Sequence, residues 1–573
     1  MKKSPILLIV ICLLAVISVN VISSFYHWRF DLTSEKRYTL SSSTKDMLKS
    51  LDDYVYFKVF LTGDDLPAGF QRLRNETREM LDEFSAHSKY VEFDFIDPAE
   101  SQDAELTQRT YAELYDLGLQ PTELRIKTKD GAEQKIIFPG AIATYKEKEI
   151  AIQLLQNQVG VPNDEVLNNS IQSLEYQLSN AIRKITSDSK ANVAILEDYG
   201  TMPPSLTVSF ENMLKEYYNV ERITLGGHLN SLADISDKGG DTVKMSNKYN
   251  VLVVAGPTVP FSEKDKFIID QFVMRGGNIL WLVEPLAVTM DSLQNKPDTY
   301  AVENNTNTVD MLFNYGVRLE NQLVVDAQCL SIPMTVGNVG DKPQIDFFKW
   351  HFFPVLIPTS THPIVKNLNA IKTEFVSPIT AIEVDGISST TLLSTSSYSN
   401  ILPSPVLVSL RALNENINVG DYKYKNIPVA VLLEGKFTSL YDNRIPAELI
   451  DNTLMDFQAQ GKPAKMIVVS DADIIKNQFR AGDGIPLPVG YDQYTDIQFG
   501  NRELLMNMMN YLCGDDDLIS VRSRELKLRT LDMEKVKNHA TMTKVMNVAL
   551  PPLMIICAGL LFNVIRKRKY TKK

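Results

Sequence analysis

Hydrophobic and polar positions alternate in two different ways near the beginning of the chain. Residues 54–62 and 90–97 alternate with the two-residue period of half-buried strands, whereas residues 70–87 carry apolar side chains at helical spacing. A strand, a helix and a strand in this order are typical of a crossover between parallel strands. We therefore expect these three segments to form one β–α–β unit.

The pattern then changes from a crossover to hairpins. A helix is expected near residues 104–118, and residues 122–155 alternate around an Asp130-Gly131 pair, which is a hairpin turn signal. Strand, helix, strand, helix and then antiparallel strands form a thioredoxin-like order, so we expect a thioredoxin-like domain over residues 29–160. The CxxC redox motif of that fold is missing from the sequence, which predicts the scaffold without its chemistry.

Two helical segments border this domain. Ser43 with Asp46 three residues later is similar to a capping box, so we expect the entry helix to begin at Ser43. Residues 170–186 carry apolar side chains on one helical face, which predicts an amphipathic helix within a linker of residues 161–190.

A second pattern of nearly continuous apolar strands and intervening helices begins after residue 190. Such strands are typical of a parallel sheet that is covered on both faces. The expected strands are residues 191–198, 249–257 and 277–285, the expected helices are residues 205–217, 262–275 and 501–512, and later strands of the same sheet are expected at residues 428–437 and 465–473. Clusters of Asn, Thr and Ser between residues 300 and 425 indicate loops and insertions. We therefore expect a second α/β domain over residues 191–520.

Two uncharged apolar runs lie near the two ends of the sequence. Residues 5–24, within the segment 1–28, and residues 545–565 are each long enough to cross a hydrocarbon core of roughly 30 Å. A cleaved signal peptide is the alternative for the first run, but the sequence after it offers only a poor cleavage site. A buried core helix is the alternative for the second run. We expect both runs to be transmembrane helices.

Basic residues beside these runs predict their orientation. Lys2 and Lys3 precede the first run, and the tail of residues 566–573 carries six basic residues. Since basic flanks stay on the cytoplasmic side, we expect both termini in the cytoplasm and the chain between the anchors on the other side of the membrane. Residues 521–544 should then form a juxtamembrane stalk.

The charge and the cysteines exclude several classes of protein. The formal charge is −11, and the region between the two basic tips holds 51 basic against 70 acidic residues. Such an acidic body binds nucleic acid poorly, so no nucleic acid is expected as a partner. Cys12 and Cys557 lie in the apolar runs, and Cys329 and Cys513 are far apart in the sequence. Neither a disulfide framework nor a thiolate metal site is therefore expected.

Common catalytic and nucleotide-binding motifs are absent from the sequence. It contains no GxxxxGK[ST] phosphate loop, no GxGxxG after a strand, no GxSxG and no HExxH. We expect that this chain does not hydrolyse ATP itself, that it is not an enzyme, and that it has no catalytic, cofactor-binding or metal-binding residues.

Carboxylates do gather near the predicted carboxyl ends of the parallel strands. Ligands of open α/β sheets bind along that rim, so a ligand-binding rim is one interpretation. The other interpretation, which the sequence favours, is that acidic residues simply end strands and cap the helices that follow. The residues concerned are Glu197, Asp198, Glu284, Asp471 and Asp473.

Several stretches between the two apolar runs resemble one family. They include RFDLTSEKRYTLSSSTKDMLKSL after the first run, then VAILEDYG, NILWLVEP and VVSDADIIKNQF, and NRELLMNMMNYLCGDDD before the second run. The sequence resembles the accessory proteins of gliding-motility ABC transporters over most of its length. The resemblance implies a polytopic ABC permease and a separate cytoplasmic ATPase as partners, contact with membrane lipid, and a large periplasmic domain on a bacterial inner membrane. It also implies a role in gliding motility and in the associated secretion system.

A second resemblance concerns the middle of the chain. The region from residue 191 is similar to a flavodoxin-like or class I amidotransferase-like domain, in which the strand that matches GNILWLVEP would end in a nucleophilic cysteine. Val283 and Glu284 stand at that place, and the nearest cysteine is Cys329. Amide transfer is therefore not expected, and a binding or structural role is favoured.

The sequence therefore predicts a non-catalytic accessory subunit of an ABC-type assembly, and two rival functions stay open. An exported receptor for a small molecule or sugar should have a concave pocket of several hundred cubic ångströms with converging polar groups. An exported hydrolase should use the carboxylates at the strand ends, so that replacing Glu284 and Asp471 by Ala should affect its function.

Overall fold

The computed structural model describes residues 39–63, 66–99, 103–128, 131–156, 163–186, 190–237, 243–339, 342–366, 368–414, 417–442, 456–514 and 540–570. The chain divides into two compact units, one of Thr39–Arg524 and one of Met1–Tyr38 together with Glu525–Lys573. The predicted first transmembrane run and residues 521–539 of the predicted stalk lie outside the described residues.

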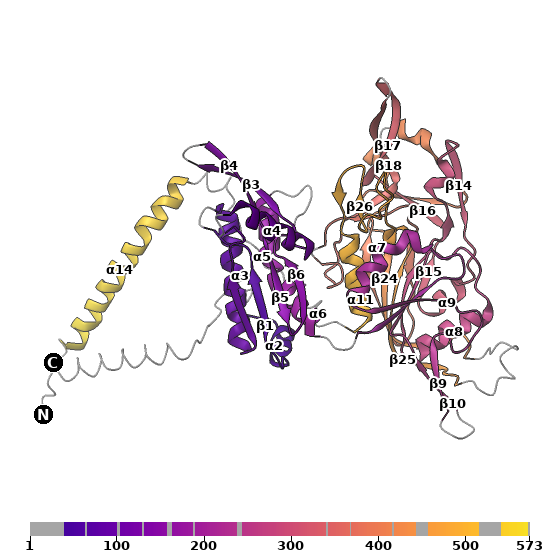
Figure 1. The fold of residues 1–573 in the computed structure, drawn as a ribbon, viewed down its shortest axis with the longest axis horizontal. Helices are drawn as coiled ribbons and strands as arrows, with labels where there is room; N and C mark the ends of the chain where they lie inside the picture. The colour runs from indigo at the N-terminus through magenta and orange to yellow at the C-terminus, as the bar shows by residue number, and fades with distance from the viewer. Residues whose placement is uncertain are drawn as a thin grey trace. The chain divides into compact units, whose positions relative to one another are not determined.

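The first sheet has four strands in the order β2-β1-β5-β6, and β1, β5 and β6 are labelled in Figure 1. The strands are β1 (Val55–Val59), β2 (Val91–Phe95), β5 (Gly140–Tyr145) and β6 (Lys148–Gln153). β1 and β2 are parallel, and α3 (Ala68–His87) connects them, which confirms the predicted β–α–β unit. β5 is antiparallel to both β1 and β6. Alternate residues of β1 are buried, as the two-residue period requires.

Both predicted hairpins are present. After α4 (Ala104–Asp116), β3 (Thr122–Thr128) pairs antiparallel with β4 (Gly131–Ile137), and β5 then pairs with β6. Of the predicted Asp130-Gly131 turn, Asp130 lies outside the described residues and Gly131 is the first residue of β4.

The entry helix begins one residue before the predicted start, and its N-cap lies two residues before Ser43. α2 (Ser42–Lys49) has Ser41 as its N-cap, whose Oγ accepts a hydrogen bond of 3.1 Å from the Thr44 amide, so the prediction of a cap at Ser43 was wrong. A tertiary contact determines this start, because the carboxylate of Glu175 accepts hydrogen bonds from the Ser41 amide at 2.7 Å and from the Thr44 hydroxyl at 2.8 Å. Local spacing in the sequence does not show this contact.

The predicted linker helix of residues 170–186 spans two helices. α5 (Asn163–Gln172) ends where α6 (Leu174–Thr186) begins, so the prediction of one helix was wrong. Leu174, Leu178 and Ile182 of α6 are fully buried against the first sheet and α3. The apolar face that predicts the helix is therefore the face that packs α6 against the first sheet and α3.

The second sheet has seven strands in the order β21-β24-β25-β12-β11-β7-β8. Five of them, β25 (Gln460–Val469), β12 (Asn278–Leu282), β11 (Val251–Ala255), β7 (Asn192–Leu196) and β8 (Asn219–Ile223), run parallel. β24 (Pro428–Thr438) is antiparallel to β25, and β21 (Ile387–Ser394) is antiparallel to β24. The prediction that residues 428–437 and 465–473 belong to this sheet is confirmed, but residues 428–437 run in the opposite direction.

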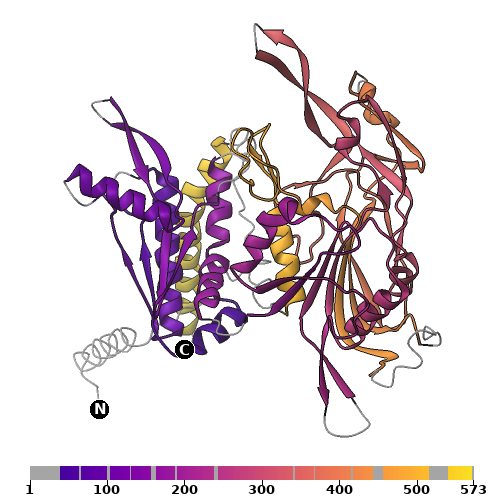
Figure 2. The ribbon, with the colours of Figure 1, turned by 45° about the vertical axis from the view of Figure 1, so that its right-hand side comes forward.

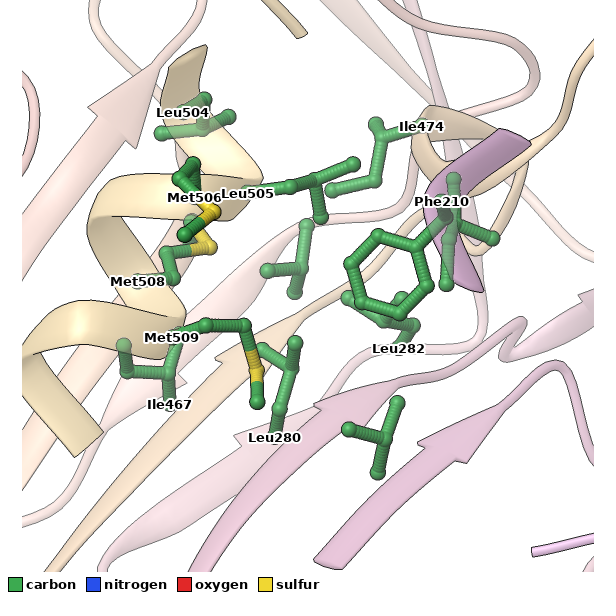
Figure 3. Packing of buried hydrophobic residues seen from close by; sticks show 14 of the residues in the cluster. Phe210, Leu280, Leu282, Ile467, Ile474, Leu504, Leu505, Met506, Met508 and Met509 are labelled. Atoms are coloured by element: carbon green, nitrogen blue, oxygen red, sulfur yellow. The ribbon is translucent and has the colours of Figure 1, made fainter. Parts of the chain in front are cut away.

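Helices cover both faces of this sheet, as the continuous apolar strands predicted. α7 (Pro204–Lys215) and α11 (Asn501–Leu512) pack on one face, and α8 (Glu263–Met274) and α9 (Val309–Asn314) pack on the other. Figure 3 shows the first of these cores, where Leu505 and Met509 of α11 and Phe210 of α7 meet Leu280 and Leu282 of β12. The interior is therefore a continuous apolar layer in which each strand contributes side chains to both faces.

Residues 300–425 are inserted in the chain between the neighbouring strands β12 and β25, and they hold many strands that the prediction of loops missed. β17 (Cys329–Val339) and β18 (Lys342–Leu356) form a long hairpin that projects outward in Figures 1 and 2. Trp350, Phe352 and Phe375 belong to a separate buried cluster in this region. In β21 the side chains of Ser388, Ser389 and Thr391 are exposed, and such runs of polar residues look like loops in the sequence.

Shorter elements complete the unit of Thr39–Arg524. The strands are β9 (Ala233–Asp237), β10 (Val243–Asn247), β13 (Leu286–Ala287), β14 (Asp298–Glu303), β15 (Val317–Leu319), β16 (Gln322–Asp326), β19 (Ile371–Lys372), β20 (Ile379–Ala381), β22 (Ser399–Pro403), β23 (Val406–Ser409), β26 (Tyr491–Asp492) and β27 (Ile497–Gln498). The 3₁₀ turns are η1 (Met290–Leu293), η2 (Leu410–Asn414), η3 (Val419–Asp421) and η4 (Asp473–Ile475).

The described part of the other unit is a single long helix, α14 (Ala540–Tyr570). Its segment Asn547–Tyr570 is long and apolar enough to cross a membrane, and large side chains such as Ile555 and Phe562 are exposed. Lys567, Arg568 and Lys569 lie in its last turn. The helix predicted at residues 545–565 is therefore present.

Candidate functional site

Three of the five predicted rim carboxylates come together in the structure. Glu284 follows β12 by two residues, and Asp471 and Asp473 follow β25. β12 and β25 are neighbouring parallel strands, with Leu282 opposite Val469, so the two chain segments leave the sheet side by side. One carboxylate oxygen from each of the three residues lies within 4.8 Å of the other two. We refer to Glu284, Asp471 and Asp473 as the acid cluster.

Backbone amides fix the geometry of the acid cluster. The Ala472 amide donates to Glu284 Oε1 at 2.6 Å, and the Glu374 amide donates to Asp471 Oδ2 at 2.8 Å. The second oxygen of Asp471, Oδ1, accepts the Asp473 amide at 2.7 Å, at the start of η4. Asp471 is only 1% exposed, so this carboxylate organises the loop between β25 and η4, as the capping interpretation expects.

Two lysines balance part of the charge. Lys476 Nζ lies 3.3 Å from Asp473 Oδ1, and Lys372 Nζ lies 3.6 Å from Glu374 Oε1. Burial acts to lower the pKa of Lys476, but the charges of Asp473 and Glu374 raise it above its usual range. Asp473 and Glu374 therefore each have a lysine ammonium group within 4 Å.

Burial and mutual repulsion raise all three pKa values of the acid cluster. Burial followed by the charges of Asp471 and Asp473 raises the pKa of Glu284 well above its usual range, and burial followed by Asp473 does the same to the pKa of Asp471. Burial followed by the charge of Glu374 raises the pKa of Asp473 to about 6. The cluster can therefore hold protons that exposed carboxyls would have lost.

The chemistry open to the acid cluster follows from this arrangement. Three converging carboxylate oxygens are a ligand set for a hard divalent cation, and protonated carboxyls could serve as acids. However, both carboxylate oxygens of Asp471 already accept hydrogen bonds from backbone amides. Lys476 forms an ion pair with Asp473 and would compete with a cation there. The contacts among the described residues are those of a structural cluster in which Lys372 and Lys476 offset part of the negative charge.

The other two predicted residues lie elsewhere. β11 separates β7 from β12 in the sheet, so Glu197 and Asp198, which follow β7, do not join the acid cluster. Asp198 Oδ2 accepts the Leu225 amide at 2.8 Å, and burial, ahead of other causes, raises its pKa. Glu197 is exposed to solvent.

Sequence reasoning missed Glu374, Lys372 and Lys476. Lys476 lies three residues after Asp473, which is ion-pair spacing on a helical turn, so it could have been found. Glu374 and Lys372 belong to the region 300–425, for which the sequence predicts loops. They precede Asp473 by about 100 residues, so no local sequence pattern connects them with it.

Cys329 and Cys513 are poor nucleophiles. Burial raises the pKa of the Cys329 thiol to about 11 and the pKa of the Cys513 thiol to about 12, so both are protonated at neutral pH. After the end of β12, where the amidotransferase-like resemblance implies a nucleophilic cysteine, Val283 is buried and Glu284 belongs to the acid cluster. These observations provide no thiolate for amide transfer.

Comparison with known proteins gives a coarse but consistent result. Residues 190–508 match a family described as an ABC-type uncharacterized transport system, and residues 34–144 match a domain of unknown function. An uncharacterized protein of Borreliella burgdorferi is 20% identical over 560 residues, which cover 95% of this chain and 94% of that protein. A solved structure, the mmIFT52 N-terminal domain, is 14% identical with a TM-score of 0.31 and covers 56% of this chain and 97% of that structure.

Proposed function

We propose that this chain, which belongs to the auxiliary family of ABC-type uncharacterized transport systems, is a non-catalytic and membrane-anchored accessory subunit of such a transporter. The observation that carries the proposal is the family match over residues 190–508, which includes all five parallel strands of the second sheet. The family supports an accessory role in transport, and the missing phosphate loop supports an ATPase on another chain.

The proposed partners are a polytopic ABC permease and a separate cytoplasmic ATPase. α14 supports a membrane partner, because its apolar side chains, Ile555 and Leu560 among them, are exposed along a length that matches a bilayer. A helix of this kind is stable in lipid, and packing against permease helices would give it specificity. Nucleic acid is not a proposed partner.

The proposed location is the inner membrane of a bacterium, with two spans. Lys567, Arg568 and Lys569 at the end of α14 support a cytoplasmic C-terminus. An N-terminal anchor at residues 5–24 would place the N-terminus on the same side and the residues between the anchors in the periplasm.

We further propose that the two sheets belong to a thioredoxin-like domain and to a flavodoxin-like or class I amidotransferase-like domain. The order β1-α3-β2-α4 followed by antiparallel strands supports the first assignment, and the five parallel strands with helices on both faces support the second. Neither domain carries the usual cysteine of its fold at the expected place, which supports binding or assembly over catalysis.

The finer proposal is that the transporter serves gliding motility and the associated secretion system. It rests only on the resemblance of the sequence to the gliding-motility accessory protein GldG. Deletion of the chain from its host should abolish gliding if this proposal is right, whereas the accessory role itself does not depend on it.

Co-purification from native membranes tests the accessory role. The full chain with an epitope tag after Lys573, extracted in a mild detergent, should bring down a permease and an ATPase in stable ratio. The matched control replaces Asn547–Ile565 by an unrelated apolar helix and keeps the basic tail, so that the chain stays in the membrane but loses the specific surface of α14. We expect the control to lose both partners.

Two results would contradict the proposal. The first is a chain that elutes alone under conditions that preserve other membrane complexes. The second is a chain that retains its partners but hydrolyses ATP without them.

A further inference from the structure

A cavity of about 610 Å³ lies outside the acid cluster, within the unit of Thr39–Arg524. This volume falls in the range of small-molecule sites. One wall comes from α5 and α6, and the other comes from α7, β27 and the first turns of α11, which are labelled in Figure 1 where there is room. We refer to it as the amide cleft, because eight of its seventeen lining residues are Asn or Gln.

Two side chains of α6 that line the cleft, Gln177 and Asn180, make no hydrogen bond with other described residues. Leu174, Leu178 and Ile182 bury one face of α6, while Gln177 and Asn180 of the neighbouring face line the cleft. Among the described residues, the side-chain amides of Gln177 and Asn180 make no hydrogen bond, and the same holds for Gln172 at the end of α5. An amide group that is partly buried without a partner retains its full capacity to donate and accept.

The opposite wall holds its amides in place. The Gln498 side chain donates through Nε2 to the carbonyls of Val489 and Phe499, both at 2.9 Å, which leaves Oε1 as an acceptor. Asn369 accepts the Ala370 amide at 2.9 Å. Fixed groups on one wall and the side-chain amides of Gln172, Gln177 and Asn180 on the other form a site that is partly organised before a ligand arrives.

The charge and the rings of the cleft limit the class of ligand. Arg502 and Glu503 are the charged residues of its lining, so the lining is neutral overall although the chain is acidic. Tyr176, Tyr217 and Phe499 supply aromatic surface. A ligand with many hydroxyl groups, which both donate and accept, and with apolar C–H faces would satisfy these amides and rings without bringing charge.

We propose that the amide cleft binds an uncharged oligosaccharide. The proposal is independent of the transporter partners, because it rests on the lining of the cleft and not on α14. It also adds a ligand-binding task to a subunit without catalysis. A second cavity of about 360 Å³ shares Asn180 and Tyr217 with the cleft and is lined by Arg183 and Lys184. Acidic glycans are therefore the discriminating comparison.

The test uses the full chain in lipid nanodiscs, without maltoside detergents, which would themselves occupy a sugar site. A glycan array with neutral and acidic glycans identifies the preferred class, and calorimetry with the best neutral oligosaccharide measures its Kd. Gln177→Ala and Asn180→Ala should each weaken binding about threefold to tenfold, since each removes hydrogen bonds to the ligand. Their Tm should stay at or above that of the parent, because Ala is a better helix former and no contact within the described chain is lost.

Gln108→Ala is the matched control, since Gln108 is an exposed amide in the middle of α4 and lies outside the cleft. It should bind as the parent does. The proposal is overturned if no neutral glycan binds, if acidic glycans bind in preference, or if both cleft variants bind like Gln108→Ala.

Discussion

At the scale of single residues, folding raises the pKa values of the acid cluster and so disfavours the ionised form of its carboxyls. Burial and neighbouring charge raise the pKa of Asp473 from 3.8 to about 6 and raise those of Glu284 and Asp471 as well. Between these two pH values the folded chain holds a proton that the unfolded chain has released. The contribution of Asp473 to stability is therefore complete below pH 4 and is lost as the pH rises through about 6.

Asp473→Asn should flatten this dependence. An amide cannot ionise, so the penalty that the parent acquires between pH 4 and pH 7 disappears, and the variant should gain about 1–3 kcal/mol relative to the parent over that interval. Part of the gain is offset because Lys476 loses its ion pair at 3.3 Å. Thermal unfolding of the full chain at a series of pH values measures the effect.

Asp385→Asn, at an exposed position before β21, is the control and should leave the slope of Tm against pH unchanged. A variant of Asp473 with the parent's slope would show that this carboxyl titrates in the ordinary range.

The site was only partly visible in the sequence at this scale. Glu284, Asp471 and Asp473 could be grouped in advance because the carboxyl ends of parallel strands meet at one edge of a sheet. Glu374 could not, since it reaches the cluster through its backbone amide from a segment that has no periodic pattern. Asp198 shows the reverse error, because strand adjacency and not strand type decides which rim residues meet.

At the scale of secondary-structure elements, one glycine determines whether the two antiparallel strands can pair. Gly435 of β24 lies opposite Ile387 of β21 with a φ of +152°. A Cβ at this position would lie 2.0 Å from the carbonyl oxygen of Gly386, which belongs to the backbone and cannot move aside cheaply.

Gly435→Ala should therefore separate the end of β21 from β24 and destabilise the chain by about 2–4 kcal/mol. Circular dichroism during heating should show a Tm several degrees below that of the parent.

Gly337→Ala in the β17–β18 hairpin is the matched control, because nothing lies within 4 Å of the added Cβ. It should unfold like the parent. Equal Tm values for the two variants would contradict the steric argument.

The elements themselves were predictable to different degrees. α3, α8 and the strands β7, β11 and β12 have strong periods and caps such as Ser262, whose Oγ accepts the Asp265 amide, so the sequence predicts them well. The start of α2 depends on Glu175, which lies more than 130 residues away. Apart from the β17–β18 hairpin and β21, the strands between residues 300 and 425 have six residues or fewer, and over so few residues a two-residue period cannot be distinguished from a loop.

At the scale of the whole molecule, the proposed topology makes a test of its own. If both termini are cytoplasmic, protease added outside intact spheroplasts should cut between residues 39 and 514 and should leave an epitope after Lys573 protected. The basic last turn of α14 is the physical reason for this orientation. Immunoblotting against the epitope and against the body measures both outcomes.

Permeabilised cells are the control, in which the epitope should also be digested. A body that resists protease in intact spheroplasts while the tips are cut would reverse the proposed orientation.

The order of strands in the second sheet has a consequence for synthesis. β12 ends at Leu282, but its neighbour β25 begins at Gln460, so about 180 residues are made between them. At ribosomal rates of 5–20 residues per second, the apolar edge of β12 stays without its neighbouring strand β25 for roughly 10–35 s. A nascent chain with such a delay needs a holdase, or it aggregates before the last strand arrives.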